Sequence, residues 1–208
     1  KERAERGRAR LLAEFRWAQT AERVTLAAKR WNSLPSCTEE ATPLRVGWVS
    51  SWNTRCGIAS YSGYLVSHSR LDVKVFAARR KPEEELDKWL LPADGPEVVR
   101  CWASGDGDDL LELQTAILAD LPNAVVIQFN YGLYSFSALA SLISCLKQVG
   151  VTIIVTLHTT ADPPHLPDRR LEYLIQVLEE CDRLLAHTPQ DLNRLKALGL
   201  TENTALLP

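Results

Sequence analysis

The residues best suited to chemistry lie where a predicted strand over 44–50 passes through a polar loop into a predicted helix over 58–69. The start of a helix offers unpaired backbone N–H groups and the positive end of the helix dipole. The sequence Cys56-Gly57-Ile58 stands at this start, and a glycine lets an anion approach the backbone closely. The junction therefore indicates a site for a phosphate or another anion. The alternative is a turn that serves packing only, because the three spaced glycines of a dinucleotide fingerprint are absent.

A second candidate follows the predicted strand over 151–157, where His158 and Thr159 begin a proline-rich loop. At neutral pH an imidazole donates or accepts a hydrogen bond without carrying a full charge, which suits contact with a polar ligand. The alternative for His158 is a bond to a neighbouring backbone carbonyl that completes the strand.

Further polar and aromatic side chains stand at the ends of predicted strands. They are Trp52, Asn53 and Arg55 after the first strand, Gln128, Asn130, Tyr131 and Gly132 at the end of the fourth, and His187 after the sixth. Trp52 either stacks on a sugar ring or packs against the protein. Arg55 either neutralises a phosphate or lies in solvent. We interpret His187 as a strand-end residue, and His68 and His165 as surface residues.

An alternation of apolar runs and helical patterns predicts the elements that position these residues. Strands are expected over 44–50, 71–77, 98–102, 124–129, 151–157, 183–186 and 205–207, and helices over 58–69, 108–120, 135–149, 168–180 and 189–198. This rhythm is typical of an α/β fold, here a Rossmann-like parallel sheet of about seven strands with helices on both faces. In such a sheet the ligand binds beyond the carboxyl ends of the strands.

Composition excludes several classes of function. The 208 residues carry 24 basic and 26 acidic side chains, a net charge of -2, which disfavours a general binder of nucleic acid or membrane surfaces. The five cysteines form no Cys-x-x-Cys pair and have no histidine at ligand spacing, so no metal site is expected. With no signal peptide and no long apolar segment, the chain is predicted to be cytoplasmic, without a transmembrane segment.

The N-terminal part stands outside this α/β rhythm. Trp17, Ala21, Val24, Ala28 and Trp31 recur at helical spacing, which predicts a long amphipathic helix over 1–33. A loop-like stretch over 34–43 is predicted to be a linker, and the α/β domain follows over 44–208. The sequence contains no methionine, so we expect it to be an internal piece of a longer polypeptide.

Four stretches in order resemble the N-terminal lobe of family 4 glycosyltransferases of the GT-B architecture. They begin at Trp52, Val125, Thr156 and Cys181, and read WNTRCGIASY, VVIQFNYGLY, TLHTT and CDRLLAHT. The resemblance covers about residues 44–208. The stretch EFRWAQTAER over 14–23 is similar to the tail of the C-terminal lobe in the same family, so the parent is expected to be a tandem enzyme.

The resemblance implies retaining transfer of a sugar from a nucleotide-sugar substrate to a glycan or lipid-linked acceptor, with no other cofactor and no metal. It implies that Cys56, Gly57 and Ile58 lie near the donor diphosphate and that His158 lies beside the donor sugar. The sugar or acceptor surface would include Trp52, Asn53, Arg55, Gln128, Asn130, Tyr131 and Thr159. The partner of this lobe would be the C-terminal lobe, which carries the nucleotide-binding residues, so the 208-residue chain alone is expected to be inactive.

Two other functions remain open from the sequence. One is a non-catalytic module for glycan binding or assembly in a larger complex. The other is a nicotinamide-dependent dehydrogenase, which is disfavoured because Gly57 lacks neighbouring glycines and the second strand ends in Ala77-Ala78-Arg79 rather than an acidic residue.

Overall fold

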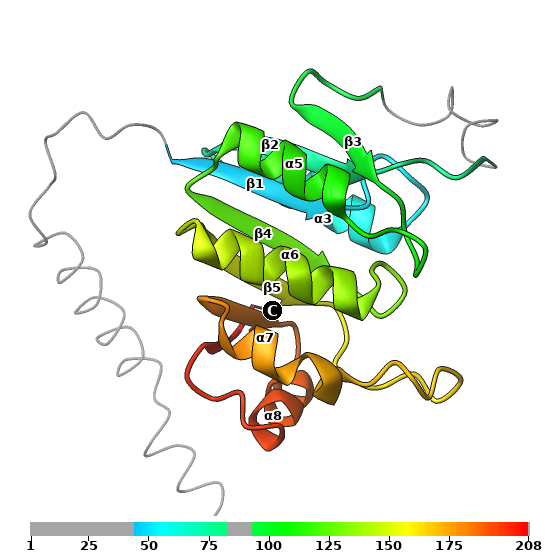
Figure 1. Cartoon of the computed structure of the whole chain (residues 1–208), viewed down its shortest axis with the longest axis vertical. Coiled ribbons are helices and arrows are strands. Elements are labelled where there is room, and N and C mark those ends of the chain that lie inside the picture. Colours follow the sequence, from blue (N-terminus) through cyan, green and yellow to red (C-terminus); the bar gives the residue numbers. More distant parts are fainter. Residues whose placement is uncertain (1–43, 83–92, 208) are drawn as a thin grey trace, which may run out of the picture. The chain divides into compact units, whose positions relative to one another are not determined.

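One parallel sheet of seven strands organises the described part of the chain, residues 44–82 and 93–207 of a computed structural model (Figure 1). The strands lie in the order β3-β2-β1-β4-β5-β6-β7. Their bounds are β1 Arg45–Ser50, β2 Asp72–Ala78, β3 Val98–Trp102, β4 Ala124–Phe129, β5 Thr152–Leu157, β6 Arg183–Ala186 and β7 Thr204–Leu206. Each pair of neighbours is parallel.

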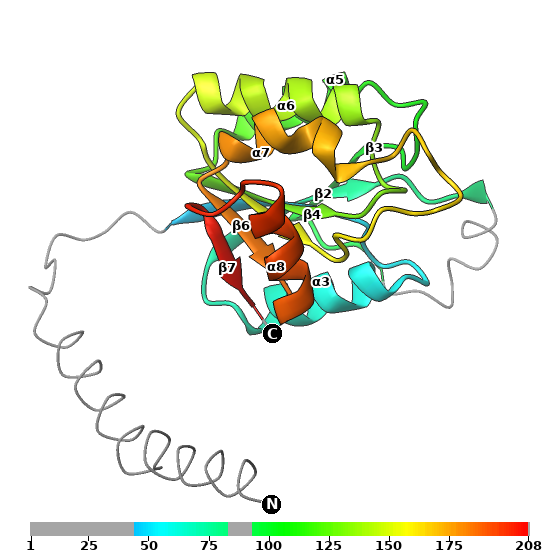
Figure 2. The ribbon, with the colours of Figure 1, turned by 90° about the horizontal axis from the view of Figure 1, so that it is seen from below.

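Helices cover both faces of this sheet. They are α3 Gly57–His68, α5 Leu111–Asp120, α6 Phe136–Gln148, the 3-10 turn η2 Leu171–Leu174, α7 Ile175–Glu179 and α8 Pro189–Ala197. Figure 2 shows α5, α6 and α7 on one face and α3 and α8 on the other. The prediction of a Rossmann-like α/β fold is confirmed.

Burial explains why the central strands form where they do. Every residue of β4 is buried, as expected for a strand covered on both faces, and its sequence is a nearly unbroken apolar run. Helix α6 turns Leu139, Leu142, Ile143 and Leu146 toward the sheet, a helical spacing that places them on one face. Together they form the centre of the larger apolar core.

Gly47 in β1 is required by packing. A Cβ atom at this position would lie 3.0 Å from the Phe76 ring and 3.3 Å from Val125. A Cβ atom there would crowd these side chains, so the glycine allows them to pack closely over β1.

Two predicted helices begin later than expected. The helix predicted from residue 108 begins at Leu111, because Leu110 has a positive φ of 60° and the Asp108 carboxylate accepts hydrogen bonds from the backbone N–H groups of Leu110 and Ala103. The helix predicted from residue 168 begins at Leu171 as a 3-10 turn, whose first N–H donates to Asp162.

The signals at both ends of α8 are confirmed. The Thr188 hydroxyl accepts a hydrogen bond from the backbone N–H of Asp191, and Pro189 occupies the first turn. After the last turn, Gly199 has a φ of 93°, the left-handed conformation that ends many helices.

The predicted helix over 1–33 and the linker over 34–43 lie outside the described residues. Within the described residues, every helix is too short or too polar to cross a bilayer. The domain boundaries and the location in the cell remain predictions.

Candidate functional site

The candidate site lies at the carboxyl edge of the sheet, on the right in Figure 1. From β1 the chain first builds β2 and β3 on one side, and then continues with β4 on the other side of β1. The ends of β1 and β4 therefore flank the point where strand order reverses, which is the usual position of a ligand crevice.

Helix α3 presents its N-terminus at this edge. Cys56 has the extended conformation of an N-cap, but its side chain does not cap the helix. The first N–H groups of an α-helix have no partner within the helix. A Cβ atom built on Gly57 would meet nothing within 4 Å, so the space above this backbone is open.

Tyr61, one turn into α3, connects this helix start to two histidines. Its ring centroid lies 5.1 Å from that of His158 and 5.1 Å from that of His187, and the two imidazoles are 5.0 Å apart. Gly57 and His158 therefore lie on the same edge of the molecule. Tyr61 was not predicted as a site residue, although its spacing of four from Gly57 places the two on one helix face.

Gln128 fixes the state of the His158 imidazole. Its amide oxygen lies 2.8 Å from Nε2 of His158, while its amide nitrogen donates to the Thr156 hydroxyl at 3.4 Å. Since the oxygen can only accept, Nε2 of His158 carries the proton and Nδ1 keeps its lone pair. The His158 side chain is thus bound to another side chain, and the backbone-carbonyl alternative applies only to its main-chain N–H, which donates to Phe129.

The environment also keeps this imidazole neutral. Burial, with a smaller contribution from the nearby His187, lowers the pKa of His158 to about 4. At neutral pH His158 is therefore an uncharged ring with one fixed donor and one acceptor.

Two residues predicted to contact a sugar are buried and form hydrogen bonds within the protein. Gln128 has no exposed surface, because it lies inside β4 and its amide is used by His158 and Thr156. Tyr131 is 4% exposed, and its hydroxyl donates to the Asp162 carboxylate at 2.8 Å. Burial and this carboxylate raise the pKa of Tyr131.

Trp52 packs against the protein, which was one of its two predicted roles. It is 8% exposed and forms a small apolar cluster with Val75 and Ala77, against which Val66 of α3 packs. The adjoining Asn53 has a φ of 47° and donates to the Asp94 carboxylate at 2.9 Å, which holds the loop after β1 in position.

The remaining predicted residues shape the loops at the edge. The Asn130 side chain accepts a hydrogen bond from the N–H of Gly132, and the Thr159 hydroxyl accepts one from the N–H of Ala161. Arg55 is exposed and, with Cys56, lines a hollow of about 200 Å³.

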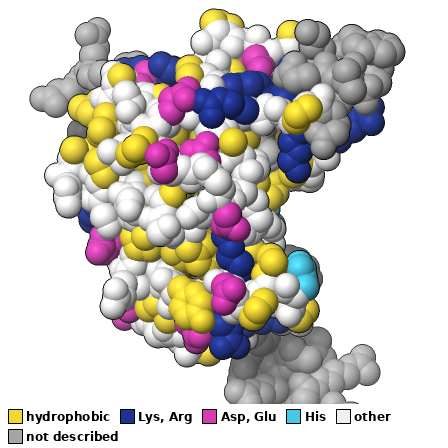
Figure 3. All heavy atoms as spheres, turned by 45° about the vertical axis from the view of Figure 1, so that its right-hand side comes forward, with side chains coloured by type: hydrophobic (Ala, Val, Ile, Leu, Met, Phe, Trp, Pro, Cys, Tyr) yellow, Lys and Arg dark blue, Asp and Glu magenta, His cyan; other side chains and the backbone are white. Residues whose placement is uncertain are grey.

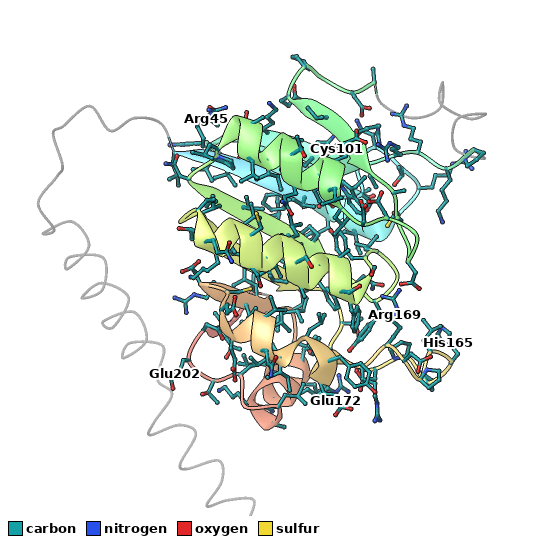
Figure 4. All side chains as sticks on the ribbon, in the orientation of Figure 1. Arg45, Cys101, His165, Arg169, Glu172 and Glu202 are labelled. Atoms are coloured by element: carbon teal, nitrogen blue, oxygen red, sulfur yellow. The ribbon has the colours of Figure 1, made fainter. Side chains whose placement is uncertain are left out.

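The interpretation of the other histidines agrees with their surroundings. His187 bonds the carbonyl of Leu207 through Nδ1 at 2.9 Å, which ties β6 to the end of β7, and its Nε2 is buried without a partner. His68 is exposed and stacks on Tyr64. His165 is exposed at the tip of the proline-rich loop, away from the sheet (Figure 4).

The described residues contain neither a cluster of metal ligands nor a disulfide. Within 44–82 and 93–207, side chains of the usual ligand types form no cluster of three or more that could hold a metal ion. The cysteines of this part, Cys56, Cys101, Cys145 and Cys181, are unpaired.

Comparison with known proteins supports the fold at low sequence identity. No model of a known family and no curated protein matches the chain. The solved structure of UDP-N-acetylglucosamine 2-epimerase from Rickettsia bellii is similar, with a TM-score of 0.56 and 13% identity over 79% of this chain and 44% of that one. The chain thus spans less than half the length of that epimerase. Hydroxymethylglutaryl-CoA lyase from Pseudomonas aeruginosa gives a TM-score of 0.37 at 13% identity over 79% of this chain and 67% of that one. The first likeness shows a GT-B-like Rossmann fold.

Proposed function

We propose that this chain supplies the N-terminal lobe of a retaining glycosyltransferase, which transfers a sugar from a nucleotide-sugar donor to a glycan or lipid-linked acceptor. The observation that carries the proposal is the meeting of the α3 N-terminus and the neutral His158 around Tyr61. The resemblance of the four sequence stretches supports it. So does the structural likeness to an enzyme named for a nucleotide sugar.

In this proposal the N-terminus of α3 stabilises the diphosphate leaving group. When the bond between the sugar and the diphosphate breaks, negative charge grows on the diphosphate. The N–H groups of Gly57 and Ile58 point out of the helix toward this charge, and the helix dipole adds to the attraction. The open space above Gly57 allows that approach.

In this proposal His158 binds the donor sugar. The anomeric carbon gains positive charge in an oxocarbenium-like transition state, which a charged imidazolium beside it would oppose. Because its pKa is about 4, His158 is uncharged at neutral pH and leaves Nδ1 as an acceptor for a sugar hydroxyl. Gln128 acts as a positioning residue that keeps the proton on Nε2.

This lobe offers groups on one side of a cleft only. Catalysis needs the donor to be held and its charge stabilised from both sides, so the second lobe would supply the nucleotide contacts. We expect the purified 208-residue chain to turn over no nucleotide sugar. Turnover by that chain alone would contradict the two-lobe proposal.

The test is a transfer assay on the full polypeptide to which this chain belongs, with a panel of UDP-, GDP- and ADP-sugars. Anomeric proton signals in NMR spectra would report a product with the donor's configuration retained. His158→Ala should lower kcat/KM by about 100-fold, the scale of losing one transition-state contact. His68→Ala, which changes an exposed histidine on the same helix as Tyr61, should leave it unchanged.

Three results would contradict transfer with retention of configuration. An inverted product would exclude the retaining mechanism. An epimerised nucleotide sugar formed without acceptor would point to the chemistry named for the structural neighbour. Glycan binding without turnover of any donor would favour a non-catalytic module.

A further inference from the structure

All charged side chains that line the hollow beside the α3 N-terminus are cationic. The hollow lies beyond the ends of β1, β2 and β4, and its lining includes Arg55, Arg79 and Lys81 but no carboxylate. Arg79 forms ion pairs with Glu112 and Asp108, which lie outside the lining, and Arg55 and Lys81 have contacts elsewhere as well. Three cationic side chains nonetheless meet at one concave surface, which favours an anion there.

Neutral hydrogen-bond donors complete this lining. Ser51, Thr54 and Ser104 line the hollow together with Cys56, the N-cap of α3, whose sulfur accepts a hydrogen bond from the Ser51 hydroxyl. Hydroxyls bind phosphate oxygens, and guanidinium and ammonium groups add charge-assisted bonds. The donor set therefore matches a phosphate group.

Gly132, which lines the hollow, has no steric reason to be glycine. A Cβ atom there would meet only the Asn130 amide oxygen at 3.9 Å, and Gly132 lacks the positive φ that favours glycine. The fold thus leaves room at this position that a bound group would occupy.

The hollow is separate from the three rings that contact one another at the end of β5 and β6. Tyr61, His158 and His187 are not among its lining residues. The hollow is lined by residues at and beyond the ends of β1, β2, β3 and β4, whereas the imidazoles follow β5 and β6. Its volume of about 200 Å³ is below the usual range for a whole drug-sized ligand, so it fits one group of a larger molecule. In Figure 3, Lys and Arg side chains lie in the upper part of the visible face, with Asp and Glu side chains beside them.

We propose that this hollow binds a phosphate group carried by the acceptor, so that the acceptor of the proposed transfer is a phosphorylated molecule. The inference rests on the proposed function for the role of acceptor. The phosphate lies among Arg55, Arg79 and Lys81, while the acceptor's attacking hydroxyl extends toward the donor sugar beside His158. A phosphate monoester carries a charge of about −1.5 to −2 at neutral pH, which the guanidinium and ammonium groups of the lining attract.

The experiment is calorimetric titration of the 208-residue chain with glucose 6-phosphate, inorganic phosphate, glucose and UDP. Glucose 6-phosphate and inorganic phosphate should bind with a Kd on the order of 1 mM, and glucose should not bind in that range. Arg55→Gln and Lys81→Gln should each weaken glucose 6-phosphate binding about tenfold, the loss of one charge-assisted bond. Gly132→Val should weaken it too, by filling the hollow.

Lys147→Gln is the matched control, because Lys147 pairs with Asp182 near the opposite edge of the sheet and should leave binding unchanged. Circular dichroism confirms that each variant is folded. Absence of phosphate binding, or binding that Arg55→Gln and Lys81→Gln leave intact, would overturn the inference.

The UDP arm separates the two proposals. If the variants weaken UDP binding and glucose 6-phosphate does not bind, the hollow holds the donor diphosphate; the inference then fails and the glycosyl-transfer proposal stands. If glucose 6-phosphate binds as expected but the full polypeptide transfers no sugar, the proposed function fails and the phosphate site remains.

Discussion

The hydrogen bond between Gln128 and His158 fixes which ring nitrogen of His158 carries the proton. The Thr156 hydroxyl orients the Gln128 amide, and the amide oxygen receives the Nε2 proton of His158. Side-chain ¹⁵N NMR of the chain should show His158 as the Nε2–H tautomer. Gln128→Leu removes the acceptor, so the two tautomers should then coexist. A wild-type signal for protonated Nδ1 would contradict this reading.

The low pKa of His158 predicts a pH effect on stability. The unfolded histidine titrates near 6.5, and the folded one near 4. Between these values the unfolded chain binds more protons, so stability is complete above about pH 6.5 and is lost as the pH falls toward 4. Urea unfolding at pH 7 and pH 5 measures the change.

His158→Asn should flatten this pH dependence, whereas His165→Asn, at the exposed loop tip, should keep it. Equal slopes for wild type and His158→Asn would show that His158 titrates normally.

At the scale of elements, α8 is attached to the loop that follows β5. The Asp191 carboxylate accepts hydrogen bonds from the hydroxyl and N–H of Thr160 and from the Thr188 hydroxyl. Although burial works in the opposite direction, these bonds lower the pKa of Asp191. Asp191→Ala should therefore reduce the free energy of unfolding by about 1–3 kcal/mol, and should increase amide hydrogen exchange at Thr160. Glu202→Ala, an exposed acidic residue, is the control; equal losses from both variants would contradict the role of Asp191.

Sequence patterns predicted the elements because their causes are local. The apolar run of β4 and the Thr188-Pro189 start of α8 act within a few residues. The later start of α5 depends on Asp108 binding the N–H of Ala103 across a turn. Hydropathy does not reveal such a bond.

The supporting role of Gln128 has a non-local cause. Gln128 lies within β4 and is paired with Thr156 of β5, so its amide nitrogen donates to the Thr156 hydroxyl inside the sheet. Strand pairing over this distance is set by the whole fold. The sequence therefore placed His158 and Gly57 at one edge of the sheet, but did not show that the Gln128 amide is bonded to His158 and Thr156.

At the scale of the molecule, the core joins the sheet to α5, α6 and α7. Leu142 of α6 is 1% exposed within this core, whereas Leu111 of α5 is 58% exposed. Leu142→Ala should lower the free energy of unfolding in urea by about 2–5 kcal/mol, from lost burial and the cavity left behind. Leu111→Ala should change it by less than about 1 kcal/mol. Similar losses from the two variants would mean that α6 is not packed as described.

The account as a whole depends on one edge of the sheet binding a nucleotide sugar. The most direct measurement is a ¹H–¹⁵N NMR titration of the chain with UDP-N-acetylglucosamine, which follows the amides of Gly57 and Ile58 and the imidazole nitrogens of His158. We predict that these signals shift together along one binding curve, while amides at the amino edge, such as that of Val46, stay in place. Shifts confined to the amino edge, or movement of the Gly57 amide without any change at His158, would contradict the account.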